Sequence, residues 1–216
     1  MSEISLIELT LWIITAIIFG IFAFVFIKRA YTKEDVSKSF NLAAGILFVG
    51  LGMRFIMGLF ATGEDKFIMF LSNSFLFIAV LPLGIYLERL FFRKSKNFLS
   101  LLAIILFVIN VIISIGSNFT GSIMFVWVIP PFLVELIILL WGYIQLIRKS
   151  TGIVRKSAIF IFIGCILIIF FGFVHGVIGP GGQIQIPGIA EIVGITFPII
   201  IILGALIAAK GFFGYS

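Results

Sequence analysis

The segment Leu6–Ile27, LIELTLWIITAIIFGIFAFVFI, decides the fold class, because its 22 residues include a single ionisable side chain, that of Glu8. At about 1.5 Å per residue, a helix of this length crosses the roughly 30 Å hydrocarbon core of a bilayer. Glu3 and Glu8, rather than lysine or arginine, stand at its leading end. We therefore predict a permanent transmembrane helix and not a cleaved signal peptide.

Six further apolar runs of similar length follow, and none alternates polar with apolar residues as the strands of a membrane barrel would. The chain is 62% hydrophobic and only 11% charged, against about a quarter charged in soluble domains. We predict an all-α integral membrane protein, a single domain over residues 1–216 with no soluble domain. The predicted bundle has seven transmembrane helices: Leu6–Ile27, Phe40–Ala61, Phe67–Tyr86, Phe98–Gly116, Ser122–Ile147, Ser157–Ile178 and Ala190–Ala209.

The distribution of basic residues predicts the orientation. Thirteen of the 15 lysines and arginines fall in the first, third and fifth connections or in the C-terminal tail, whereas the opposite connections keep only Lys66. Positively charged loops stay in the cytoplasm. We therefore expect a multi-pass protein of the cell membrane, with its N-terminus outside and its C-terminus in the cytoplasm.

Several classes of function are not expected. The basic residues recur in small clusters rather than on one surface, so no nucleic-acid partner is predicted. One histidine and one cysteine cannot supply the usual zinc ligand sets, and we predict no metal, no cofactor, no catalytic residues and no enzyme activity. The topology is similar to that of microbial rhodopsins, but Lys210 ends the predicted last helix at the cytoplasmic surface. Because no aspartate lies in any predicted span to act as a counter-ion, we expect no retinal.

A few polar residues within or beside the spans are the candidates for a binding site, because a charge in a bilayer costs at least about 2.5 kcal/mol. Most of them fall in the predicted outer half. We expect an outward-facing polar pocket formed by Arg54, Asn73, Asn110, Glu135, His175 and Glu191. Each also has a structural alternative, since intramembrane asparagines and ion pairs hold helices together.

Pro130 and Pro131 stand shortly before Glu135 and predict a kink in the fifth helix, since proline removes helical hydrogen bonds. Glu135 could bind a cation, take up a proton or pair with Arg54. We expect Arg54 to have an acidic partner, either Glu135 or, slightly favoured, Glu191.

Three functions remain open at this point. The first is a receptor-like sensor that binds a small or lipophilic ligand in its outer half and signals to a cytoplasmic or membrane protein partner. The second is a small solute or proton-coupled transporter with Glu135 as the coupling carboxylate. The third is an accessory subunit of a membrane complex. Polar residues through the cytoplasmic half would favour the transporter, and the sequence suggests that this half is nearly all apolar, which favours the sensor.

Overall fold

The structure is a computed structural model that describes residues 6–32, 35–60, 66–92, 97–119, 121–178 and 189–215. Throughout these ranges the chain is helical, apart from a few residues at helix ends. The elements are α1 (Leu6–Thr32), α2 (Asp35–Phe60), α3 (Lys66–Phe91), α4 (Phe98–Gly116), α5 (Gly121–Lys149), α6 (Gly152–Ile178) and α7 (Ile189–Tyr215). All seven are long and apolar enough to cross a membrane, so the predicted all-helical, multi-pass architecture is confirmed at this level.

Most helices extend further than the apolar runs predicted. The α4 bounds agree with the prediction, but α1 continues past Ile27 to Thr32, α3 continues past Tyr86 to Phe91, and α7 continues past Lys210 to Tyr215. Lys210 therefore does not end the last helix. The extra turns carry charged residues, which a hydropathy boundary excludes although nothing in their backbone opposes a helix.

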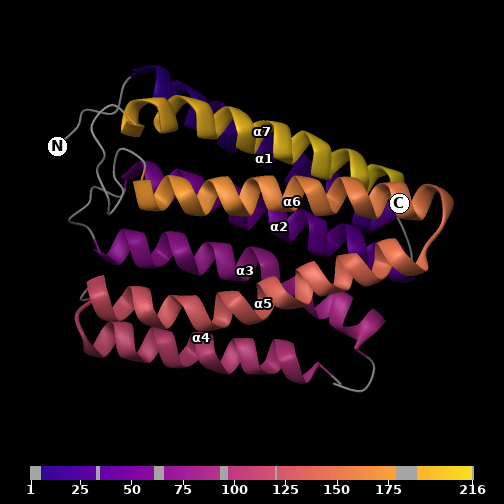
Figure 1. Cartoon of the computed structure of the whole chain (residues 1–216), viewed down its shortest axis with the longest axis horizontal. Helices are drawn as coiled ribbons and strands as arrows, with labels where there is room; N and C mark the ends of the chain where they lie inside the picture. Colours follow the sequence, from indigo (N-terminus) through magenta and orange to yellow (C-terminus); the bar gives the residue numbers. More distant parts are fainter. Residues whose placement is uncertain are drawn as a thin grey trace.

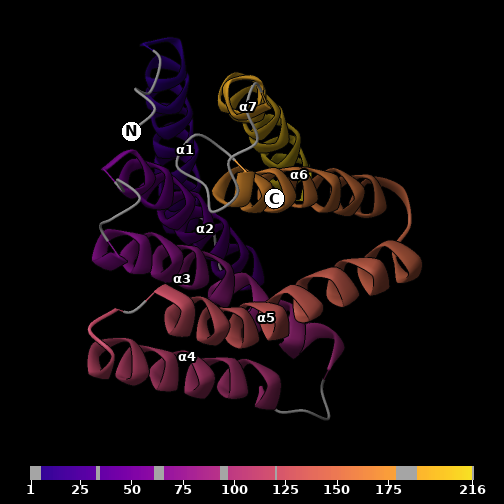
Figure 2. The same ribbon diagram turned by 60° about the vertical axis from the view of Figure 1, so that its left-hand side comes forward.

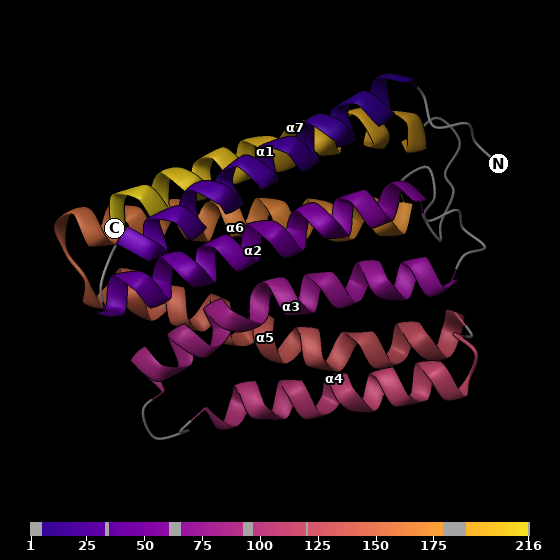
Figure 3. The ribbon, with the colours of Figure 1, turned by 180° about the vertical axis from the view of Figure 1, so that it is seen from behind.

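Six of the helices form a closed ring. Around it α1 packs on α2, α2 on α3, α3 on α5, α5 on α6, α6 on α7 and α7 on α1 (Figures 1 and 2). The fourth helix stands outside this ring, against α5 and, to a smaller extent, α3. The two chain termini lie at opposite ends of the bundle (Figure 3), which we call the N-terminal end and the C-terminal end.

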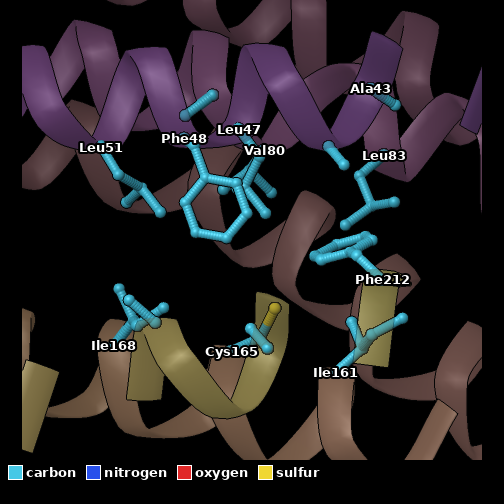
Figure 4. Packing of buried hydrophobic residues seen from close by; sticks show 14 of the residues in the cluster. Ala43, Leu47, Phe48, Leu51, Val80, Leu83, Ile161, Cys165, Ile168 and Phe212 are labelled. Atoms are coloured by element: carbon cyan, nitrogen blue, oxygen red, sulfur yellow. The ribbon is translucent and has the colours of Figure 1, made fainter. Parts of the chain in front are cut away.

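The interior of the ring is filled by apolar side chains from facing helices. Phe48 of α2 points toward Cys165 and Ile168 of α6, and Phe212 of α7 lies beside Leu83 of α3 (Figure 4). All five are buried in one hydrophobic cluster. In lipid the packing of such side chains, rather than escape from water, holds helices together.

The closest helix pair is α6 with α7. A Cβ atom added at Gly164 would lie 2.5 Å from both the backbone nitrogen of Ala208 and the carbonyl oxygen of Gly204. Glycine at this position therefore allows the two backbones to touch.

Candidate functional site

The third and fifth helices meet closely near the middle of the bundle, and glycine makes the meeting possible from both sides. A Cβ atom at Gly84 of α3 would overlap the Oε2 atom of Glu135 on α5. Further toward the C-terminal end, a Cβ at Gly142 of α5 would lie 3.0 Å from the Cβ of Leu87 on α3. At each of these two positions, a glycine on one helix therefore leaves room for a side chain of the other helix.

Glu135 lies at the centre of this contact. It is 14 residues from each end of α5, about 21 Å along the helix axis in either direction. Its side chain has no exposed surface, and neither carboxyl oxygen has a hydrogen-bond partner. Since buried polar groups are normally hydrogen-bonded, an unsatisfied carboxyl at this depth calls for a functional explanation.

A second fully buried acid, Glu88, lies one turn beyond Gly84 on α3. Its carboxyl group is well satisfied. Oε1 accepts the backbone N–H of Leu99 at 2.9 Å, and Oε2 accepts both the backbone N–H of Ser100 at 2.8 Å and its hydroxyl at 2.6 Å.

These donors belong to the first turn of α4, whose N–H groups have no partner within their own helix. Asn97, the residue at the N-cap of α4, makes no side-chain capping bond. Glu88 therefore caps α4 from another helix, where a negative charge is favoured by the helix dipole.

The two acids have opposite surroundings, although Glu88 is only one helical turn along α3 from Gly84, the residue that the Glu135 carboxyl group lies against. Glu88 accepts three hydrogen bonds from the described part of α4, which suit an ionised carboxylate. Glu135 has none, which suits a neutral carboxyl group. The pair can thus hold one proton between two carboxyls. Among the residues described, no group of three or more His, Cys, Asp or Glu side chains could hold a metal ion.

The predicted polar pocket is dispersed over separate helices, as far as its members are described. Arg54 donates to the carbonyl oxygen of Gly172 on α6 at 3.4 Å, and the hydroxyl of Ser72 on α3 donates to the backbone oxygen of Arg54 at 3.1 Å. Asn73 is half-buried on α3. Asn110 is buried on α4, where its Oδ1 accepts the hydroxyl of Ser114 at 3.3 Å.

Within the described ranges, no hydrogen bond or ion pair joins Arg54, Asn73, Asn110 or Glu135 to another of the four. Arg54 and Glu135 are therefore not paired. The side chains of His175 and Glu191 lie outside what the structure describes, so the alternative pairing of Arg54 with Glu191 stays a prediction.

Pro130 and Pro131 both lie inside α5, which continues through them to Lys149. The axis of α5 changes direction near its middle in all three ribbon views (Figures 1, 2 and 3). That these prolines cause the bend, and that it serves function, stays a prediction.

Glu88 was missed by sequence reasoning, and so was Glu8, a buried acid of α1 whose carboxyl group lies against Gly194 of α7. Both stand at the edge of an apolar run, where a charge is normally assigned to the interface. One signal for Glu88 was available: continued at helical spacing, α3 places it one turn from Gly84 and on the same face.

Comparison of the chain with known protein families, with curated proteins and with solved structures gives no match.

Proposed function

We propose that this protein is a small transporter of the cell membrane that couples the movement of a solute, or of protons alone, to protonation of Glu135. The observation that carries the proposal is the fully buried carboxyl group of Glu135, whose two oxygens lack hydrogen-bond partners. Burying such a group in a bilayer costs free energy, and ionisable residues inside membrane proteins commonly form proton and ion pathways.

The C-terminal end of the bundle adds support, because it is more polar than the sequence suggested. Glu88, Asn41, Ser100 and Ser157 are all buried there, and Oδ1 of Asn41 has no hydrogen-bond partner. All four stand within three residues of the end of an apolar run, where the sequence places the membrane boundary. Buried polar groups at this end favour a transporter over a sensor.

In this proposal the C-terminal end faces the cytoplasm, because lysines and arginines gather there. Glu135 would exchange its proton with either side of the membrane in turn. Movement of helices around the crossing of α3 and α5 would change which side it reaches.

Proton flux into liposomes tests the proposal. The purified chain is reconstituted with a trapped pH-sensitive dye, and a potassium gradient with valinomycin drives protons inward. We expect acidification above that of empty liposomes, and its loss in Glu135→Gln. The control is Glu8→Gln, which makes the same chemical change at a buried acid of α1, a helix that packs on α2 and α7. Equal flux in wild type and Glu135→Gln would contradict the assignment.

The folding of the variant gives a second check. Glu135 is not paired with Arg54, so Glu135→Gln should fold normally and lose only function. Loss of folded protein that a neutral residue at position 54 restores would instead assign Glu135 a structural ion pair.

A sensor is the second candidate, and the position of α4 favours it. This helix stands outside the ring, where a shift could be passed to a membrane or cytoplasmic partner. A sensor would bind a lipophilic ligand and give no proton flux in the liposome experiment.

A further inference from the structure

We infer that Glu135 and Glu88 share one exchangeable proton, and that its transfer to Glu88 releases the N-terminus of α4. The inference rests on the proposed function, because a coupling carboxylate needs a route for its proton toward one surface. It adds a second proton-binding residue and a helix that responds to it.

The first step is the resting distribution of the proton. The Glu88 carboxylate is held by two backbone N–H groups and one hydroxyl at 2.6–2.9 Å, all from α4. Such donors at a helix N-terminus stabilise negative charge. Glu135 has no donor at either oxygen, so the neutral form is the one that its surroundings accept. The proton therefore rests on Glu135 and the charge on Glu88.

The second step is the route. Glu135 lies directly against Gly84, and Glu88 follows one turn later on the same face of α3, about 6 Å along the axis. Because residue 84 has no side chain, the carboxyl group of Glu135 occupies the surface of α3 next to Glu88. Residues 84 and 88 are i,i+4 neighbours on the surface of α3. A rotation of the Glu135 carboxyl group or a bridging water is the connection that the transfer requires.

The third step is the transfer itself. The O–H bond of Glu135 breaks, an O–H bond forms on a carboxyl oxygen of Glu88, and the negative charge moves from Glu88 to Glu135. No other reactant is needed. The protonated oxygen of Glu88 is then a weaker acceptor than a carboxylate oxygen, so its hydrogen bonds to Leu99 and Ser100 weaken. The negative charge at the helix N-terminus is lost as well.

The consequence falls on α4. Its first turn is held to α3 by these bonds, its N-cap residue supplies no side-chain bond, and its packing on α3 is otherwise slight. Neutral Glu88 therefore loosens the beginning of α4 from α3 at the C-terminal end, while α4 stays packed on α5. Proton position and helix position are coupled in this way, as alternating access requires.

Infrared spectroscopy of the purified full chain in liposomes tests the shared proton. We expect a C=O stretching band of a protonated carboxyl group that is absent in Glu135→Gln. The pH at which this band titrates should move by about one unit or more in Glu88→Gln, since strongly coupled acids titrate as a pair. It should not move in Glu8→Gln. A band that survives in Glu135→Gln, or a midpoint that is unchanged in Glu88→Gln, overturns the inference.

Hydrogen exchange of the first turn of α4 tests the release. We expect the amides of Leu99 and Ser100 to exchange faster in Glu88→Gln than in wild type, and to stay protected in Glu135→Gln, where Glu88 keeps its charge. If Glu88→Gln does not fold, Ser100→Ala removes one bond to Glu88 and leaves both acids in place. It should accelerate exchange and shift the titration of the band, and no change in either overturns the inference.

The two proposals fail differently. A shared band and coupled exchange without proton flux would leave the proton pair intact and refute the transport of protons alone. Flux that is lost in Glu135→Gln but fully kept in Glu88→Gln would support transport and refute the transfer to Glu88.

Discussion

Replacing Gly84 by alanine places a methyl group where the Glu135 carboxyl group lies. A Cβ atom at residue 84 would overlap Oε2 of Glu135 and lie 3.0 Å from its carboxyl carbon. The carboxyl group is the end of a side chain, but Glu135 has no exposed surface. It can move away only by displacing packed neighbours.

Two opposing effects set the magnitude. Alanine is favoured over glycine inside a helix by about 1 kcal/mol, whereas overpacking of a filled interior costs about 1–3 kcal/mol. Gly20→Ala is the matched control, because Gly20 lies inside α1 and nothing is within 4 Å of its Cβ position. The two variants should therefore differ in unfolding free energy by about 1–3 kcal/mol, or in Tm by about 2–12 °C for a chain of this size.

Thermal unfolding in detergent micelles measures this difference, and a double-mutant cycle assigns it. In a Glu135→Ala background the carboxyl group is absent, so Gly84→Ala should behave like Gly20→Ala. The coupling between positions 84 and 135 should be about 1–3 kcal/mol. Equal destabilisation by Gly84→Ala in both backgrounds would refute the contact between Gly84 and Glu135, and with it the route to Glu88.

Three further predictions concern orientation, the bend and the fold. A cysteine introduced at Gly63 should react with an impermeant thiol reagent in intact cells, and one at Ser95 only after permeabilisation; labelling of Ser95 in intact cells would reverse the orientation. Replacing Pro130 and Pro131 together by alanine should straighten α5 and lower proton flux while the protein still inserts, and unchanged flux would separate the bend from function. Gly164→Ala should destabilise by about 1–3 kcal/mol or more, because the clash is with backbone that cannot rotate away, and an unchanged Tm would show that α6 and α7 are further apart.

The number of helices could be predicted from the sequence, and so could the bounds of α4, because long apolar runs have one stable form in lipid. The ends of α1, α3 and α7 could not, since the turns beyond their apolar runs carry Arg29, Arg89 and Lys210 and hydropathy excludes these turns. The candidate site was predicted in part. Glu135 was named from its depth, but its neighbour Glu88 was assigned to no site because it stands at the end of an apolar run.

The sequence by itself determined that the chain is a bundle of membrane-length helices with an acid in the middle of one of them. Hydrophobic length along the chain carries that information, and no long-range contact is needed. Only the tertiary structure decided that α4 stands outside a six-helix ring, that Arg54 does not pair with Glu135, and that Glu88 caps α4 one turn from the Glu135 contact. Each of these three features depends on which helix faces pack together. Small residues such as Gly84 determine this packing because they leave room for a side chain of the neighbouring helix. Side-chain volume matters between segments that are far apart in the sequence. Neither hydrophobic periodicity nor hydropathy along the chain therefore predicts which helix faces meet.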